Sequence, residues 1–251
     1  MSLRDLRAGR AAPELTLVLL HHAGGSAASF APFARLLPAS WRLLAAELPG
    51  RFYEPPTRRC RNVGEAVAHL SAALRRELAG PYALFGHSLG ALLAFEVARE
   101  LERDGPGPAW LGVSGCPAPP AFAATWASAR GGDISPQRLP RWVRGVGGGG
   151  RFDERMLATL RDDLAIAADY TFTAGAALRA SLSVFQGDAD PLTSARNVAA
   201  WAAQAGAGAA FHTLPGGHFF LFDHPAQMCE RIVYGCRGAL PVYSLSGSAE
   251  R

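Results

Sequence analysis

Three residues whose types could together form a nucleophilic catalytic site lie far apart in this sequence: Ser88, Asp190 and His218. A serine hydroxyl is a poor nucleophile until a neighbouring base removes its proton, and an imidazole titrates near neutrality, which suits it to that task. A carboxylate must then hold the imidazole in the right tautomer and stabilise the imidazolium that forms. These residue types therefore predict acyl transfer to a serine, provided that the fold brings the side chains together.

Ser88 lies within the pattern Gly-x-Ser-x-Gly at residues 86–90, which follows the apolar run 82–85 and precedes a long amphipathic stretch. This context predicts a strand, an abrupt turn and a helix, an arrangement that lifts the serine hydroxyl clear of the sheet. Glycines are expected at 86 and 90 because a side chain there would collide across the bend. The pattern alone is a weak signal, and a helix-capping serine in a glycine turn is the alternative interpretation.

The acid and the base are predicted from the loops that follow two later strands. Asp190 comes after the apolar run 182–185 and is our choice for the carboxylate, because Pro191 stiffens the turn immediately after it; Asp188 is the alternative. His218 follows two glycines after the last predicted strand. Taken singly, an aspartate before proline is commonly a turn former, and such a histidine is commonly a surface loop residue.

A glycine-rich loop follows the first apolar run, residues 15–20, and reads His-His-Ala-Gly-Gly-Ser. Such a loop lets backbone amides approach a ligand closely. We predict that the amides of Ala23 and Leu89 form the oxyanion hole, with Leu89 at the start of the helix that follows the serine. Three nearby histidines are expected to support the site rather than to catalyse: His21, His22 and His87.

Apolar runs alternate with helical patterns along the chain, which predicts an α/β fold with a mostly parallel sheet and helices on both faces. Sites in such sheets lie beyond the carboxyl ends of the strands. The reactive loops occur in the order oxyanion loop, serine, aspartate, histidine, which is the order used by α/β-hydrolases. Strands are predicted at 15–20, 43–48, 82–85, 109–113, 182–185 and 210–214, and helices at 63–78, 89–103, 194–204 and 225–237.

The pattern changes after the fifth predicted strand, where the chain becomes rich in proline and glycine. Apolar residues at helical spacing over 156–166 indicate a helix, which we predict to continue to Phe172. We predict that residues 117–178 form an inserted, mostly helical lid within a single domain of residues 1–251. The four consecutive glycines at 147–150 are expected to act as its hinge.

Length and composition limit the possible classes of protein. The 251 residues are 49% hydrophobic, which is enough for one large α/β domain. The net charge of +4, without interleaved aromatic residues, does not indicate a nucleic-acid partner. No apolar run approaches the roughly 20 residues that cross a bilayer, and the first twelve residues lack the apolar core of a secretory signal. Four widely spaced cysteines indicate free thiols rather than a metal site, so we expect a cytoplasmic protein.

The chain resembles the type II thioesterases that accompany polyketide and nonribosomal peptide synthases, over nearly its whole length. The resemblance implies hydrolysis of acyl groups held as thioesters on the phosphopantetheine arm of a carrier protein, which clears stalled or wrongly primed carriers. It assigns the triad to Ser88, Asp190 and His218 and the oxyanion amides to Ala23 and Leu89. It implies that the enzyme has no cofactor or metal of its own, and we separately expect a monomer, although the sequence does not give the oligomeric state. The most specific segments are residues 22–26, 47–51 with 54–55, 86–90, 160–170, 187–191 and 216–219.

Chain-releasing thioesterase domains often carry the triad acid after the strand that ends near Ser114, whereas here the acids follow the next strand, which favours the editing type. Cys116 replaces the basic residue that the family usually has after that strand, and His21 stands where proline is common.

The alternatives to a thioesterase are a carboxylesterase or lipase with the same triad, an acyltransferase, and a non-catalytic carrier-binding protein on this fold. Five arginines are candidates for contact with an acidic carrier surface, with ordinary solvated side chains as the alternative: Arg51, Arg58, Arg59, Arg141 and Arg144.

Overall fold

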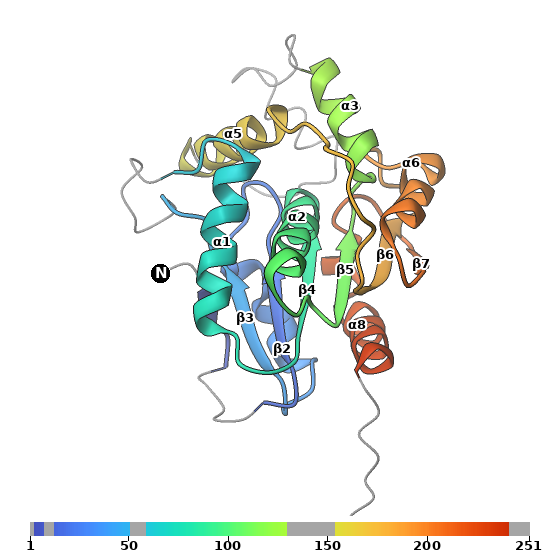
Figure 1. The fold of residues 1–251 in the computed structure, drawn as a ribbon. Coiled ribbons are helices and arrows are strands. Elements are labelled where there is room, and N and C mark those ends of the chain that lie inside the picture. The colour runs from blue at the N-terminus through green and yellow to red at the C-terminus, as the bar shows by residue number, and fades with distance from the viewer. Residues whose placement is uncertain (1–2, 8–12, 51–58, 130–153, 241–251) are drawn as a thin grey trace, which may run out of the picture.

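The computed structural model describes residues 3–7, 13–50, 59–129 and 154–240 (Figure 1). Within these ranges seven strands form one sheet in the order β1-β3-β2-β4-β5-β6-β7. Strands β2 to β7 run parallel to one another, and β1 lies antiparallel to β3 at one edge. The strands are β1 Leu3–Asp5, β2 Thr16–Leu20, β3 Arg42–Ala46, β4 Tyr82–His87, β5 Trp110–Ser114, β6 Ser181–Gly187 and β7 Ala209–Leu214.

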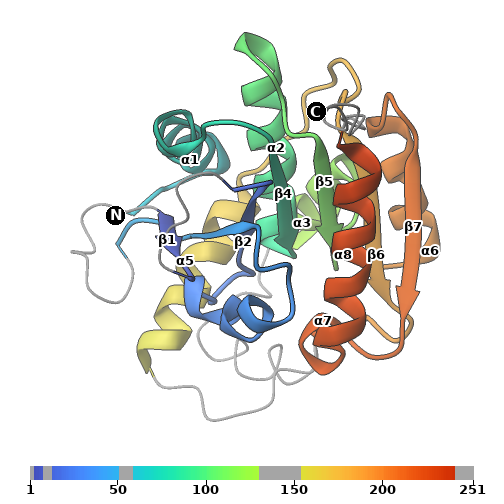
Figure 2. The same ribbon diagram turned by 90° about the horizontal axis from the view of Figure 1, so that it is seen from below.

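From β2 to β7, helical segments lie between successive strands and cover the sheet. In Figure 2, α1 and α2 lie on one side of the sheet and α8 on the other. No helix in the described part of the chain combines the length and the apolar character needed to span a membrane. The helical segments are η1 Ala27–Arg35, α1 Val63–Glu77, α2 Leu89–Asp104, α3 Pro119–Ala129, α5 Glu154–Ala168, α6 Ala195–Ala199, η3 Ala200–Gln204, α7 Phe220–Asp223 and α8 Pro225–Ala239.

Strand β2 shows why the predicted strands are continuous apolar runs. Leu17 and Leu19 pack into a hydrophobic cluster with η1 and α8, whereas Val18 and Leu20 pack into a second cluster with α1 and α2. Successive side chains of a strand point to opposite faces, so a strand covered on both faces must be apolar at every position. Each fully buried residue of this kind contributes about 1.5–3 kcal/mol to folding.

The predicted strands and helices are present, and the fold class is confirmed, but one strand was missed and one predicted helix end is wrong. The edge strand β1 was not expected, because three residues of mixed polarity give no strand signal. Helix α5 ends at Ala168 instead of continuing to Phe172. The chain turns there because Tyr170 leaves the helix to bury its ring against Phe122, with ring centroids 5.9 Å apart, and to donate from its hydroxyl to Glu96 at 2.6 Å.

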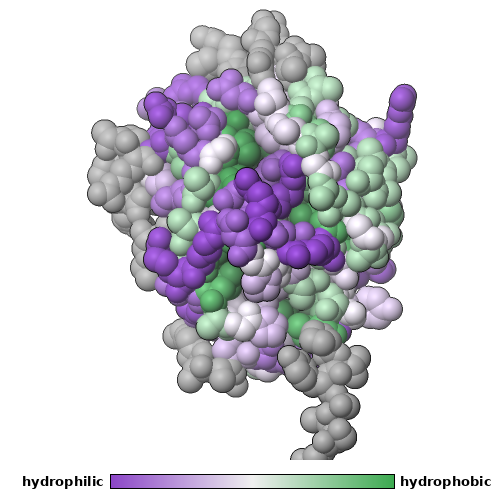
Figure 3. All heavy atoms as spheres, viewed as in Figure 1, coloured by the Kyte–Doolittle hydropathy of each residue, from purple (hydrophilic) through white to green (hydrophobic). Residues whose placement is uncertain are grey.

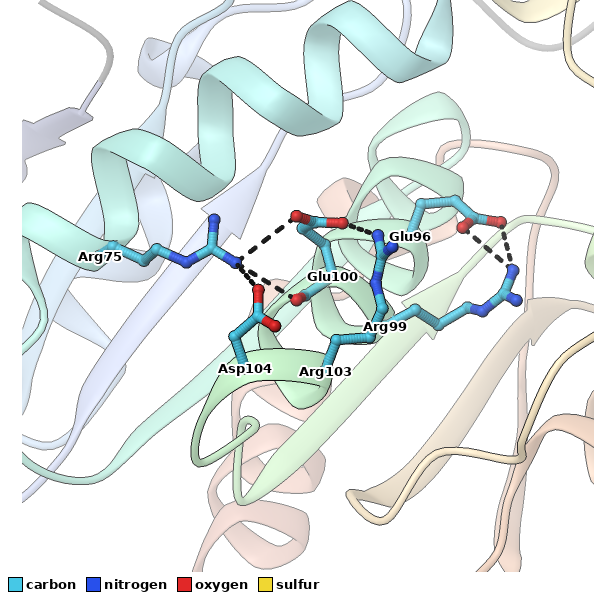
Figure 4. A network of polar contacts seen from close by, with 6 residues as sticks. All are labelled: Arg75, Glu96, Arg99, Glu100, Arg103 and Asp104. Carbon is cyan, nitrogen blue, oxygen red and sulfur yellow. Dashed lines mark hydrogen bonds and ion pairs between the residues drawn. The ribbon is translucent and has the colours of Figure 1, made fainter.

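Hydrophilic side chains gather over α1 and α2 on the face seen in Figure 3. Arg75 of α1 reaches Glu100 at 3.5 Å and Asp104 at 3.4 Å on α2, and Arg103 also pairs with Glu100 (Figure 4). Exposed ion pairs of this kind contribute at most about 1 kcal/mol each. The solvent-facing surfaces of α1 and α2 are therefore polar, whereas the surfaces that face the sheet contribute apolar side chains to the core.

The segment between β5 and β6 carries α3 and α5, which lie beyond the carboxyl ends of the strands (Figure 1). Its first end is fixed where the backbone N–H of Ala118 donates to Asn197 at 2.9 Å. Its second end is fixed by Tyr170 and by Arg99 of α2, whose guanidinium donates to the carbonyl of Thr173 at 3.0 Å. Both ends of the segment are thus attached to the main body of the fold. The glycines predicted to form a hinge, residues 147–150, lie outside the described residues.

Candidate active site

Ser88 occupies a strained turn between β4 and α2. Its φ of +56° is the only positive value at a non-glycine residue in the described part of the chain. A residue with a side chain pays an energetic cost in this region of backbone space, and such residues gather at functional sites. The backbone N–H of Ser88 donates to the carbonyl of Ser114 at 2.8 Å, which ties the turn to the end of β5.

Two glycines make this turn sterically possible, for different reasons. A side-chain carbon on Gly86 would lie 2.1 Å from the carbonyl oxygen of Gly90, a collision across the bend as predicted. A side-chain carbon on Gly90 would instead lie 2.2 Å from the carbonyl oxygen of Leu20, on the neighbouring strand. Gly90 therefore lets the start of α2 approach the end of β2, which brings the serine next to the loop that follows β2.

The structure brings Ser88, His218 and Asp190 together. The Nε2 atom of His218 lies 3.0 Å from the Ser88 hydroxyl oxygen, and its Nδ1 atom lies 2.9 Å from Asp190 Oδ2. Both distances are within hydrogen-bond range. A carboxylate can only accept a hydrogen bond, so Nδ1 of His218 carries the ring proton. The lone pair of Nε2 is therefore free to accept the serine proton. His218 is 3% exposed and Asp190 6% exposed, so bulk water does not weaken the contact between them.

The two aspartates of the β6 loop have different surroundings. Asp190 is held in place because its Oδ1 atom accepts the backbone N–H of Leu192 at 2.9 Å, on the far side of Pro191. Asp188 is exposed, and its Oδ1 atom accepts the backbone N–H of Gly216 at 2.8 Å. The structure thus places Asp190 against the imidazole and gives Asp188 a turn-stabilising contact.

His87 lies directly behind His218, with ring centroids 4.9 Å apart. Its ring is fully buried, and Nδ1 lies 3.1 Å from the hydroxyl of Ser114. Burial lowers the pKa of His87 well below its ordinary value, and the neighbouring rings of His218 and His22 lower that pKa further. His87 is therefore a neutral support for the imidazole of His218 at neutral pH, in line with the supporting role expected of it.

This buried histidine predicts a loss of stability in acid. Well above pH 6.5, His87 is neutral in both the folded and the unfolded chain and adds no pH dependence. Below pH 6.5 the unfolded chain takes up a proton that the folded chain excludes, so the free energy of unfolding falls by roughly 1 kcal/mol per pH unit. Urea unfolding at pH 7.0, 6.0 and 5.5 should show a smaller loss for His87→Asn than for the wild type. Equal losses in the two proteins would contradict this prediction.

The two amides predicted to form the oxyanion hole come from different segments, Ala23 from the loop after β2 and Leu89 from the start of α2. No described residue accepts a hydrogen bond from the amide of Ala23 or of Leu89. Leu89 is the first residue of α2, where the helix dipole favours negative charge. The next amide in the loop, that of Gly24, donates to the Oδ2 atom of Asp163 in α5 at 2.6 Å.

Asp163 contacts the predicted oxyanion loop, and the sequence analysis did not identify this residue. The structure buries it at 3% exposure, on the face of α5 that also carries Leu160 and Leu164. The signal was present in the spacing, because a charged residue three positions after one apolar residue and next to another lies on the apolar face of a helix. A charge at such a position needs a specific partner, and here that partner is the loop after β2.

Two further predictions concern groups near the site. Burial raises the pKa of the Cys116 thiol well above its ordinary value, and the charge of Asp190 adds to this effect, so Cys116 is a neutral thiol.

Of the arginines considered for carrier contact, Arg59 forms an ion pair with Asp162 of α5. The other four lie outside the described residues: Arg51, Arg58, Arg141 and Arg144. In the described part of the chain, no group of three His, Cys, Asp or Glu residues could hold a metal ion.

The fold and the site together define a class of protein. A mostly parallel sheet that carries a serine on a strained turn after β4, an aspartate after β6 and a histidine after β7 is an α/β-hydrolase fold. The family model for the thioesterase domain matches residues 15–234, so this chain belongs to the thioesterase family.

Similar proteins agree with this assignment. The thioesterase PikA5 of Streptomyces venezuelae is 34% identical over 239 residues, which covers 86% of this chain and 79% of that protein. The type II thioesterase BorB from the borrelidin biosynthetic cluster is 31% identical, with a TM-score of 0.83 over 94% of this chain and 98% of that one. RedJ, a thioesterase of the prodiginine pathway in Streptomyces coelicolor, is 32% identical, with a TM-score of 0.80 over 90% of this chain and 91% of that one. The resemblance noted in the sequence is confirmed.

Proposed function

We propose that this thioesterase removes acyl groups from the phosphopantetheine arm of carrier proteins in polyketide or nonribosomal peptide synthesis, as an editing enzyme. The observation that carries the proposal is the continuous contact from Asp190 through His218 to the Ser88 hydroxyl, at 2.9 and 3.0 Å. The names of the relatives support the substrate class, since BorB is a type II thioesterase of a biosynthetic cluster and RedJ belongs to a biosynthetic pathway.

In the proposed first half-reaction, the Ser88 oxygen attacks the thioester carbonyl carbon while its proton passes to Nε2 of His218. The carbonyl oxygen becomes an oxyanion, which the amides of Ala23 and Leu89 stabilise. Collapse of this intermediate breaks the carbon–sulfur bond, and the sulfur takes the proton from the His218 imidazolium. The products are an acyl-serine and a free pantetheine thiol.

In the second half-reaction, water attacks the acyl-serine and gives its proton to His218. The second oxyanion collapses, the bond between the acyl carbon and the Ser88 oxygen breaks, and the serine recovers its proton from the imidazolium. The net result is one carboxylic acid and one thiol from one thioester and one water. Asp190 stays ionised throughout and stabilises the imidazolium in both halves. Because thiolate is a good leaving group, attack and oxyanion stabilisation dominate the barrier.

The proposal extends to the rest of the chain. We propose that residues 1–251 form a single domain in which residues 117–178 act as a lid, which the position of α3 and α5 beyond the carboxyl ends of the strands supports. We further propose that the enzyme is a cytoplasmic monomer that works without a cofactor. Its four cysteines are free thiols, which supports a reducing compartment.

A comparison of substrates tests the proposed function. The purified chain is assayed with one acyl group presented as an acyl-carrier protein, as an acyl thioester of N-acetylcysteamine, and as an oxygen ester. Carrier and pantetheine contacts remote from the reacting carbon add transition-state binding, so kcat/KM on the acyl-carrier should exceed that on the oxygen ester by about 100-fold or more. Equal or faster turnover of the oxygen ester would instead indicate the alternative, a small-molecule carboxylesterase with the same triad.

A further inference from the structure

Asp163 of α5 is a buried carboxylate that the proposed reaction does not use. A buried charge costs several kcal/mol unless hydrogen bonds compensate it, so such a residue needs a structural reason. Here the Oδ2 atom accepts the backbone N–H of Gly24 at 2.6 Å, between residues separated by 139 positions in the sequence. The contact joins α5, in the segment between β5 and β6, to the loop that supplies the proposed oxyanion amide of Ala23.

The peptide between Ala23 and Gly24 is held at both of its polar groups. The N–H of this peptide, on Gly24, donates a hydrogen bond to Asp163. The carbonyl oxygen of the peptide, on Ala23, accepts a hydrogen bond from Nδ1 of His22 at 2.9 Å. The loop is closed behind it, where the N–H of Gly25 donates to the carbonyl of His22 at 3.0 Å. A peptide unit is planar, so fixing both groups fixes its plane. Only the two torsions of Ala23 then separate this fixed plane from the Ala23 N–H.

Helix α5 contacts the same loop a second time, one turn before Asp163. Leu160 packs against Ala23 in a small hydrophobic cluster. The Cβ of Leu160 lies 3.1 Å from the place where a side-chain carbon on Gly24 would be, and Gly24 has a φ of +75°. Residues three apart on a helix lie on the same face, so Leu160 and Asp163 both hold that face of α5 against the loop.

The charge of Asp163 does not itself favour the reaction, because a carboxylate near a developing oxyanion opposes it. Its contribution must therefore come through the geometry of the loop. We propose that Asp163 is a positioning residue for the oxyanion hole, which holds the Ala23 amide in the orientation that a tetrahedral intermediate needs. This inference rests on the proposed function. It implies that catalysis depends on the contact between α5 and the loop after β2.

The test uses the full-length enzyme and three variants. Asp163→Ala removes the acceptor, Asp163→Asn keeps a carbonyl oxygen that can accept from Gly24, and Asp169→Ala removes an exposed carboxylate just beyond the end of α5 as a matched control. Removal of one oxyanion donor costs about 100- to 1,000-fold in kcat. Because Asp163→Ala only misorients such a donor, we expect kcat on the N-acetylcysteamine thioester to fall about 10- to 100-fold with KM unchanged. Asp163→Asn should recover most of that loss, and Asp169→Ala should match the wild type.

A second readout separates positioning from general destabilisation. A trifluoromethyl ketone forms a tetrahedral oxyanion on the serine, whereas the matching thioether binds without one. Asp163→Ala should weaken inhibition by the ketone by the same factor as kcat and leave thioether binding unchanged. Equal weakening of both ligands, or a wild-type Ki for the ketone, would overturn the inference. If Ser88→Ala retains activity, the proposed function itself fails; if Ser88→Ala is inactive but Asp163→Ala behaves as wild type, only the role of Asp163 fails.

Discussion

Replacing Ser88 by alanine should reduce kcat on any acyl thioester by about 10⁵-fold or more, because the proposed histidine and carboxylate would then have no serine hydroxyl to activate. KM should change little, since the hydroxyl contributes to the transition state rather than to substrate binding. The measurement is steady-state hydrolysis of an acyl-carrier protein, combined with mass spectrometry after treatment with a fluorophosphonate. The wild type should gain one adduct, on the peptide that contains Ser88.

Ser71 offers a matched control for this experiment. It is a fully buried serine of α1 whose hydroxyl has no hydrogen-bond partner in the described part of the chain, so Ser71→Ala removes the same atom with little structural cost. Ser71→Ala should keep wild-type activity and wild-type labelling. Residual labelling or turnover in Ser88→Ala close to the wild-type level would rule out Ser88 as the nucleophile.

Replacing Asp190 by asparagine should lower kcat about 10³- to 10⁴-fold. The amide of the new side chain would present a donor to Nδ1 of His218, so the imidazole proton would move to Nε2, which could then no longer accept the serine proton. The hydrogen bond from Leu192 can still be accepted by the amide oxygen, so the loop itself should survive the change. Circular dichroism and the thermal midpoint should therefore stay near those of the wild type while activity is lost.

The companion variant Asp188→Asn distinguishes the two acids of this loop. Its amide oxygen can still accept the N–H of Gly216, so we expect activity within about fivefold of the wild type. The two variants differ in position by only two residues and carry the same chemical change, so a difference between them cannot be a general effect of charge removal. A larger loss in Asp188→Asn than in Asp190→Asn would reverse the proposed assignment.

Much of the site could be predicted because the fold has simple geometric rules. Each reactive residue follows an apolar run, and the carboxyl ends of parallel strands meet at one edge of a sheet, so residues 130 positions apart could be expected to meet. The choice of Asp190 depended on one local feature, the proline after it, and the structure shows that the turn does hold the carboxylate from the far side of that proline.

Other features could not be predicted because they arise from contacts between distant segments. The end of α5 is set by Tyr170 reaching Glu96, which no local pattern encodes, since apolar spacing continues past the last helical residue. The contact between Asp163 and the Gly24 amide joins a side chain to a backbone group. In such a contact only the side-chain partner can be recognised from its residue type. Here that partner was a charged residue on an apolar helix face.

The attachment of both ends of the β5–β6 segment has a consequence for how this scaffold can be modified. Ala118 is bonded to Asn197 at one border, and Tyr170 and Thr173 are bonded to α2 at the other. We expect that the stretch between these borders can be exchanged between relatives without changing the sheet or the turn that carries Ser88. Because the carboxylate of Asp163 accepts the N–H of Gly24, an exchanged segment must carry a carboxylate at that position to keep its contact with the loop after β2.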